Sequence, residues 1–407
     1  MSQSRIQTVA SPHRSSLQSW LAVLSVALGA FVVVTSEFLP IGLLTDIAAG
    51  LHVSDGTAGL MVTIPGLVAA LAAPVMAVAA GKVDRRTLVL SLITLLVVSN
   101  LVATLAPGFA VMLVARVLFG ITLGGFWTVA VALGSQLVPP ASMARATTII
   151  LAGISIATVI GVPAGALIAN FAGWRFAFAL VGSIALVVGV AQFFLLPSIR
   201  PKQVLGVRQI THLLRNADAR NGLFTVAFVI AGHFAAYTYI APFLKQQTGV
   251  NPGMLSTLLL AYGVAGIVGN FAGGAAAARD LRRTLVTVIL LMATAILLLP
   301  VVGLSPAGAS VLVIAWGLTF GAMPVALQLW VFKSAPDALE GGAAMMVSVF
   351  QIFIAIGSVA GGIVVDHFGT PAVMWGAGAV SLTALAMVRL SRHAPVITSG
   401  ERQPHLV

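Results

Sequence analysis

Long apolar stretches separated by short polar connections dominate the chain. We count twelve such stretches, each near the length of about 20 residues that a helix needs to cross a bilayer. They lack the strict alternation of apolar and polar residues that the strands of a membrane barrel require, so each predicts a transmembrane helix. The predicted spans are residues 20–44, 58–80, 87–106, 109–137, 146–171, 175–196, 221–244, 255–277, 284–303, 308–333, 343–365 and 371–390.

The positions of Lys and Arg predict the orientation of these spans. If the N-terminus is cytoplasmic, 18 of the 21 basic residues fall in the tails and inner loops. Of the other three, Arg116 lies within a span, and Arg175 and Lys245 face outward. Because cytoplasmic loops are enriched in basic residues, we expect both termini in the cytoplasm.

An internal repeat divides the spans into two sets of six. The segment 85–89, RRTLV, recurs 197 residues later as 282–286, and three glycines recur in the same register. The glycine pairs are Gly120 and Gly317, Gly56 and Gly253, and Gly165 and Gly362. The predicted organisation is a cytoplasmic tail (1–19), a six-helix bundle (20–196), a cytoplasmic linker (197–220), a second six-helix bundle (221–390) and a cytoplasmic tail (391–407). In the linker, Gln209–Leu214 either lies on the membrane surface or is plain solvated chain.

Composition agrees with a membrane protein and excludes several other classes. Hydrophobic residues make up 59% of the chain and charged residues 8%, whereas soluble domains carry about 25% charged residues. The absence of cysteine excludes disulfides, thiol catalysis and cysteine-bound metals. The net charge of +11 sits in short loops and forms no stripe for nucleic acid.

One carboxyl group and one guanidinium lie well inside predicted spans, away from the span ends. Arg116 is in the fourth span, and Glu37, in the first, is the one acid that we place in an apolar stretch. Each lies about seven residues, or roughly 10 Å, from the outer end of its span, so the two are close enough in depth to meet. Removal from water favours a neutral acid and a nearby arginine favours the carboxylate, so a site that alternates between these surroundings can bind and release a proton. A static ion pair is the alternative.

Aromatic and amide side chains in other spans are candidates for contact with a solute. An imidazole can bind a polar solute or titrate near neutral pH. Aromatic rings can stack on a flat ring and amides can bond its edge, although ordinary interior packing explains each residue singly. The candidates are Phe126, Trp127, His233, Tyr237, Tyr239, Trp316, Gln328 and Gln351.

Arg116 and Gly120 form an R-x-x-x-G pattern in the fourth span that resembles a motif of the major facilitator superfamily of secondary transporters. Phe119 stands where that family usually has glutamine. The loop 81–86, GKVDRR, partly resembles the family's G-x-x-x-D-R-x-G-R-R loop, which holds the transporter closed at its cytoplasmic side. Arg85 and Arg86 match its last two positions, whereas Gly81 replaces the usual aspartate and Asp84 an expected glycine. The alternative is that these basic residues only set the topology.

The fifth span contains Gly161, Pro163 and Gly165, followed by the G-W-R of 173–175. This pattern resembles a motif of the family's proton antiporters, and its G-W-R-x-x-F ending is similar to that of bacterial exporters. Pro163 can kink the helix while the two glycines admit a close neighbour, which ordinary helix packing also uses.

Several short phrases resemble a narrower group, the bacterial purine-ribonucleoside efflux pumps and the related sugar and arabinose exporters. They are residues 36–40 (SEFLP), 123–127 (LGGFW), 137–140 (LVPP), 237–240 (YTYI) and 315–320 (AWGLTF). The resemblance implies an all-α fold of two six-helix halves, alternating access and proton-driven export of nucleosides across a bacterial inner membrane. The residues alone support a small polar or aromatic solute.

Sugar or drug export, or a channel or sensor on the same fold, are the other functions that this chain could have. An intramembrane enzyme would need a nucleophile or a metal cluster, and the chain has neither an H-E-x-x-H nor a G-x-S-x-G motif. We therefore expect no enzymatic activity, no cofactor or metal and no nucleic acid. The expected partners of the monomer are a solute, protons and the lipid bilayer.

Overall fold

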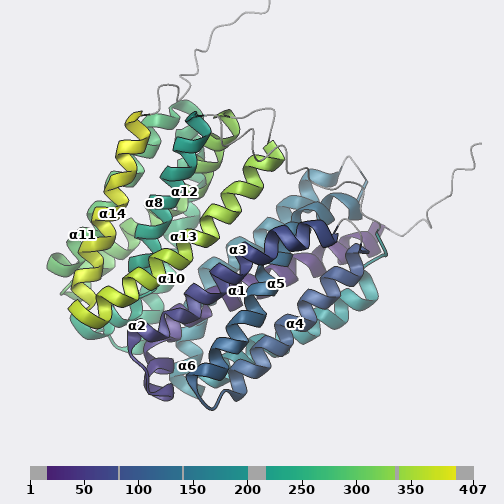
Figure 1. Cartoon of the computed structure of the whole chain (residues 1–407), viewed down its shortest axis with the longest axis horizontal. Helices are drawn as coiled ribbons and strands as arrows, with labels where there is room; N and C mark the ends of the chain where they lie inside the picture. Colours follow the sequence, from purple (N-terminus) through teal and green to yellow (C-terminus); the bar gives the residue numbers. More distant parts are fainter. Residues whose placement is uncertain (1–15, 81–82, 140–141, 200–216, 335–338, 391–407) are drawn as a thin grey trace, which may run out of the picture.

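The chain folds into helices that run through two bundles (Figure 1). The computed structural model describes residues 16–80, 83–139, 142–199, 217–334 and 339–390, and no strand occurs in these ranges. The first bundle contains α1 (Ser16–Leu51), α2 (Asp55–Ala58), α3 (Leu60–Ala80), α4 (Arg85–Leu105), α5 (Phe109–Leu137) and α6 (Met143–Leu195). The second contains α8 (Ala217–Tyr237), α9 (Ile240–Phe243), the π-helix η2 (Leu244–Thr248), α10 (Pro252–Arg279), α11 (Leu281–Val302), α12 (Pro306–Ser334), α13 (Leu339–Phe368) and α14 (Thr370–Leu390).

The twelve predicted spans can all be found in these helices. Ten described helices are long and apolar enough to cross a membrane, and the bent pair of α8 with 240–248 supplies an eleventh. The 53 residues of α6 would extend roughly 80 Å as one helix, far more than a bilayer. Gly173 interrupts that helix with a φ of 81°, which favours glycine, between the predicted fifth and sixth spans. α6 therefore holds two spans.

Each bundle is assembled by its own helix pairs. In the first, α1 packs on α6 and α3 packs on α5; in the second, α8 packs on α13 and α14, and α10 packs on α12. Two seams join the bundles, α3 against α13 and α6 against α10. In Figure 1 the axes of the two bundles are inclined to each other, and α2 lies where the bundles meet.

Two of the three repeated glycine pairs make equivalent contacts in the two bundles, whereas Gly56 packs closely on α13 and Gly253 does not pack closely on any helix. A Cβ on Gly120 of α5 would lie 2.9 Å from the Pro65 carbonyl oxygen of α3, and one on Gly317 of α12 would collide with the Tyr262 carbonyl oxygen of α10. The repeat thus presses the fourth helix of each half against the second. In the second pair, Gly165 of α6 packs against α1 and Gly362 of α13 packs against Tyr239, so this pair brings the fifth helix of each half against the first.

Large apolar side chains cover the outside of the bundles. Phe171 is 79% exposed, and Phe194, Phe271 and Phe368 are about as exposed. Exposed apolar side chains of this kind favour lipid over water as their surroundings, which is consistent with a multi-pass membrane protein. The linker segment 200–216, with Gln209–Leu214, and most of both predicted tails lie outside the described residues.

Candidate functional site

Arg116 is buried against the backbone of the neighbouring helices. On α5 it is 2% exposed. Its Nε donates to the carbonyl oxygen of Met61 at 2.9 Å, and its Nη1 donates to that of Ser36 at 3.2 Å. The guanidinium carbon lies 4.5 Å from the centre of the Phe119 ring, where a cation is attracted by the ring face. Phe119 thus occupies the glutamine position of the motif with an aromatic contact to the cation.

Glu37 of the first bundle is hydrogen-bonded to a residue of the second bundle. It lies on α1 and is 8% exposed, and its Oε1 accepts from Nε2 of Gln351 on α13 at 3.2 Å. Among the described residues no ion pair joins Glu37 to Arg116, so the direct meeting that we considered does not occur in this state. The guanidinium is nevertheless bonded to Ser36, the residue before Glu37, so its charge lies beside the acid.

α1 also extends beyond the predicted first span, so Glu37 lies farther from the end of its helix than expected. The helix continues to Leu51 instead of ending at residue 44. Glu37 is therefore about 14 residues from the end of α1, which corresponds to roughly 21 Å along the axis. Arg116 keeps its expected place, because α5 begins at Phe109 as predicted.

His233 is the centre of a cluster of aromatic rings in the second bundle. It is fully buried on α8. Phe320 of α12 stacks on its ring with the centres 3.4 Å apart, and Tyr237 stacks at 5.1 Å. Tyr262 of α10 in turn stacks on Tyr237 at 4.8 Å. Flat aromatic faces from three helices are thus gathered at one place.

A hydrogen bond within this cluster fixes the tautomer of His233. Nε1 of Trp316, which can only donate, lies 3.1 Å from Nδ1 of His233. Nδ1 therefore accepts, and the neutral ring carries its proton on Nε2. This Nε2 and the hydroxyl of Tyr262 find no hydrogen-bond partner in the described part of the chain. Buried polar groups are seldom left unpaired, so these two are suited to bind a solute.

The remaining solute-contact candidates lie in different surroundings. Phe126 is buried edge-on to Trp127, whose indole nitrogen has no partner within the described ranges. Gln328 is exposed on α12 and does not join the aromatic cluster. Tyr239 is fully buried, but its hydroxyl donates to the Ser358 carbonyl oxygen at 2.8 Å, so it serves the contact between helices.

Tyr262 and Phe320 were missing from the residues proposed from sequence. Tyr262 carries the same signal as Tyr237, a hydroxyl within an apolar span, and could have been included on that ground. Phe320 is indistinguishable from a packing residue until the fold brings it to His233.

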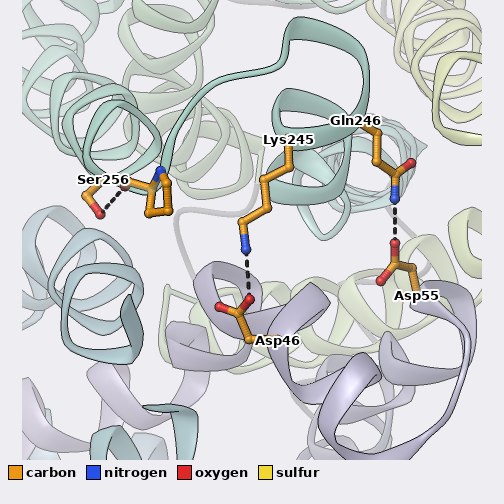
Figure 2. A network of polar contacts seen from close by, with 6 residues as sticks. Asp46, Asp55, Lys245, Gln246 and Ser256 are labelled. Atoms are coloured by element: carbon orange, nitrogen blue, oxygen red, sulfur yellow. Dashed lines mark hydrogen bonds and ion pairs between the residues drawn. The ribbon is translucent and has the colours of Figure 1, made fainter. Parts of the chain in front are cut away.

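Polar contacts between the bundles gather at the end of the molecule where α2 lies. Figure 2 shows Lys245 of η2 pointing at Asp46 of α1, and Gln246 pointing at Asp55 of α2. The Lys245 ammonium is 3.0 Å from Asp46 Oδ1, and Nε2 of Gln246 donates to Asp55 Oδ2 at 2.9 Å. Partly exposed ion pairs contribute about 0–1 kcal/mol each, so this pair can form and break during function.

Asp366 of α13 adds a second set of contacts at this end. Its Oδ1 accepts from the backbone nitrogen of Gly56 at 2.9 Å, and its Oδ2 accepts from the Ser54 hydroxyl at 2.7 Å. We call the contacts of Asp46, Ser54, Asp55, Gly56, Lys245, Gln246 and Asp366 the α2-end latch. None of these residues was a candidate from sequence, because each lies at the edge of a span, where polar residues are ordinary.

The loop before α4 is anchored by Asp84. Asp84 caps α4 by accepting from the backbone nitrogens of Arg86 and Thr87, and it also accepts from the Ser198 hydroxyl at 2.6 Å. Burial opposes its ionisation, but these hydrogen bonds outweigh burial and hold the pKa of Asp84 below its ordinary value. This capping role of Asp84 was not predicted from the sequence.

Arg85 and Arg86 bind backbone groups near the end of α6. Nη2 of Arg86 donates to the Phe193 carbonyl oxygen at 2.6 Å, and the Arg85 backbone nitrogen donates to that of Ile199 at 3.0 Å. Gly81 lies outside the described residues. In the fifth-span motif, Gly161 and Gly165 pack against Thr35 and Leu39 of α1 while Pro163 is buried within α6. The motif therefore holds α6 against the helix that carries Glu37.

No group of three or more potential metal ligands occurs in the described ranges. The site is instead a buried acid, a neighbouring guanidinium and a set of aromatic rings, distributed over both bundles. Such a set can bind a proton and a flat polar solute.

Comparison with known proteins gives consistent matches along the chain. The model of the Major Facilitator Superfamily matches residues 26–349 and 223–405. The transcription regulatory protein OpdE of Pseudomonas aeruginosa is 36% identical over 92% of this chain and 94% of its own length. The purine ribonucleoside efflux pump NepI of Salmonella paratyphi B is 32% identical over 93% and 96%, and that of Shigella sonnei is 32% identical over 90% and 93%.

Solved structures share the fold at low sequence identity. A bacterial homologue of the human lysosomal transporter Spinster matches with a TM-score of 0.78 and 16% identity, covering 93% of this chain and 97% of its own. The human organic anion transporter MFSD10 matches with a TM-score of 0.63 and 16% identity, covering 92% and 100%.

Proposed function

Because the chain belongs to the major facilitator superfamily of transporters, we propose that it exports purine ribonucleosides in exchange for protons. The observation that carries this proposal is the buried acid Glu37, which is hydrogen-bonded across the two bundles and lies beside a guanidinium. A carboxyl group in such a place is rarely kept for stability alone, since a charge within the membrane is costly.

Proton exchange follows from the surroundings of Glu37. With the site closed, Gln351 donates to the acid and the Arg116 charge lies nearby, so the carboxylate is tolerated. When the bundles separate on one side, water and protons reach the acid. Substrate and proton then compete for the same state of the site, and the two cross the membrane in opposite directions.

The α2-end latch supports alternating access. We propose that both termini are cytoplasmic, as the basic residues predict, which places the latch at the outer face of the inner membrane. Lys245–Asp46 and the contacts of Asp366 then close the outer side in this state, and they must break for solute to leave.

The proposed substrate class rests on two supports. The NepI relatives are named purine ribonucleoside efflux pumps at 32% identity over nearly their whole length. The aromatic cluster around His233 offers stacking faces, and its Nε2–H and the Tyr262 hydroxyl, which have no partner among the described residues, suit the nitrogen and oxygen atoms of a purine. Pentoses and antibiotics are the alternative substrates.

Transport into proteoliposomes tests the proposal. In liposomes with an acidic lumen, proton efflux should drive accumulation of labelled inosine, and a protonophore should abolish it. Glu37→Gln should lose accumulation but keep exchange of inosine for inosine, whereas Asp280→Asn, at the cap of α11, should behave as wild type. Wild-type protein that exchanges inosine for inosine but does not accumulate it in response to the pH gradient would exclude proton coupling. Unlabelled pentoses or antibiotics that compete better than guanosine would exclude a nucleoside pump.

One relative favours a second candidate. The 36% identical protein is named a transcription regulatory protein, which points to a membrane-embedded regulator that binds solute on the same fold. A regulator need not carry solute across the membrane. Inosine binding without any exchange of labelled inosine would support the regulator and exclude the pump.

A further inference from the structure

We propose that Gln351 is the positioning residue that prevents the empty, deprotonated protein from reorienting. It does so by holding the carboxylate of Glu37 across the interface between the bundles. This inference rests on the proposed proton exchange at Glu37, and it assigns to Gln351 a role in coupling in place of the solute contact expected from sequence.

The geometry places this hydrogen bond in a buried part of the bundle interface. Gln351 and Glu37 are 314 positions apart in sequence and are 5% and 8% exposed. At the same level α13 lies directly against α3, because a Cβ on Gly66 would be 2.9 Å from the Gln351 carbonyl oxygen. The amide therefore has little freedom, and separation of α13 from the first bundle would break its bond to Glu37.

The chemistry of an amide makes the bond sensitive to the proton on Glu37. A carboxylate can only accept, so it requires the Nε2–H of Gln351, which is what the structure has. Gln351 Oε1 is buried and finds no partner in the described residues. A protonated Glu37 can donate to this oxygen or to a water molecule, so it does not depend on the amide nitrogen.

The cost of a buried charge makes this difference between the carboxylate and the protonated acid a restraint on reorientation. Arg116 is the charged residue whose field reaches Glu37, but its hydrogen bonds go to the carbonyls of Met61 and Ser36. Pulling Gln351 away would leave a buried carboxylate without a hydrogen-bond donor, which is strongly unfavourable. The empty, deprotonated protein therefore stays in the state closed at the α2 end until solute or a proton replaces the amide.

An exchanger requires such a restraint on its empty, deprotonated state. If the empty protein reoriented both with and without its proton, protons would leak across the membrane and no gradient could drive solute. Glu37 alone supplies the proton site, and Gln351 supplies the restraint that makes proton movement depend on solute.

The test compares two buried glutamines that each bond α1. Gln351→Met keeps the side-chain length and removes the amide bond to Glu37. Gln192→Met is the matched control, because Gln192 is 1% exposed and donates to the Ser25 carbonyl of α1 at 3.0 Å, but within one bundle. Proton flux without solute is measured in liposomes with a pH-sensitive dye, together with inosine exchange and gradient-driven accumulation.

Gln351→Met should leak protons without solute at about ten times the wild-type rate, since hydrogen bonds to charged groups contribute at least that factor. It should lose accumulation and keep inosine exchange, while Gln192→Met should leak no more than wild type. Coupled accumulation without leak in Gln351→Met, or equal leak in both variants, would overturn the inference. Wild-type liposomes that do not accumulate inosine would instead overturn the proposed antiport, and the inference with it.

Discussion

Arg116 donates its hydrogen bonds to backbone carbonyls, and this leaves the carboxyl group of Glu37 for a partner in the opposite bundle. An apolar run interrupted by a single acid or base was enough to identify both residues from sequence. Their partners were not predictable, because a sequence gives the position of a residue along its helix but not the direction in which its side chain faces in the bundle. Which side chain faces which depends on how α13 is placed against α1.

His233 offers a direct test at the residue scale. Trp316→Phe keeps an aromatic ring but removes the N–H that bonds Nδ1 of His233. The imidazole then loses its fixed tautomer, so the KM for inosine should rise about tenfold, as expected for one buried polar group left unpaired. Trp375→Phe on α14, where the side chain is 51% exposed, serves as the control. Equal KM values for Trp316→Phe and wild type would remove His233 from the solute site.

At the scale of helices, prediction succeeded where local chemistry decides. α5 begins and ends at the predicted residues 109 and 137, because apolar length and flanking breakers define a span. The repeat predicted the equivalence of Gly120 and Gly317, and both close a helix pair. The α2-end latch could not be predicted, since Lys245 and Asp46 are 199 residues apart and look like ordinary residues at span ends.

The glycine contacts predict a loss of stability from a single methyl group. A Cβ on Gly321 of α12 would collide with the Gly266 carbonyl oxygen of α10, whereas one on Gly376 of α14 meets nothing within 4 Å. Gly321→Ala should destabilise the protein by about 1–3 kcal/mol. Gly376→Ala should be neutral or stabilising, because alanine is the better helix former. Thermal unfolding in detergent measures both, and equal melting temperatures would contradict the packing described here.

The cap of α4 predicts a pH dependence of stability. The folded pKa of Asp84 lies below its unfolded value, which is about 3.9. Its contribution is therefore complete above that pH and is lost as the pH falls through the folded pKa. Asp84→Ala should lower stability by about 1 kcal/mol at neutral pH, with a smaller effect in acid. Asp84→Asn retains a capping oxygen and should lack the pH dependence. Melting curves of the three proteins from neutral to acidic pH measure this, and parallel curves would contradict it.

At the scale of the whole molecule, two inclined bundles are joined at the α2 end (Figure 1), and the proposed alternating access requires them to separate at one side or the other. The seams of α3 with α13 and of α6 with α10 are the surfaces on which such movement would occur. The buried acid lies beside one of them, so the charge state of one side chain can influence the arrangement of both bundles.

Cross-linking tests whether the α2 end must open. The chain has no cysteine, so Asp46→Cys combined with Lys245→Cys provides the only thiols. Joining them with a short methanethiosulfonate cross-linker should abolish inosine exchange, and a reductant should restore it. Each single-cysteine variant, treated in the same way, should remain active. Full exchange by the cross-linked protein would show that the latch does not open during transport.

Competition between solute and proton at Glu37 is the central claim, and proton release from purified protein measures it most directly. Inosine is added to protein in weakly buffered detergent solution at several pH values around neutrality, and released protons are followed with a pH-sensitive dye. The wild type should release protons in proportion to the inosine bound, while Glu37→Gln should bind inosine and release none. Inosine binding to the wild type without proton release, or equal release by Glu37→Gln, would contradict the account.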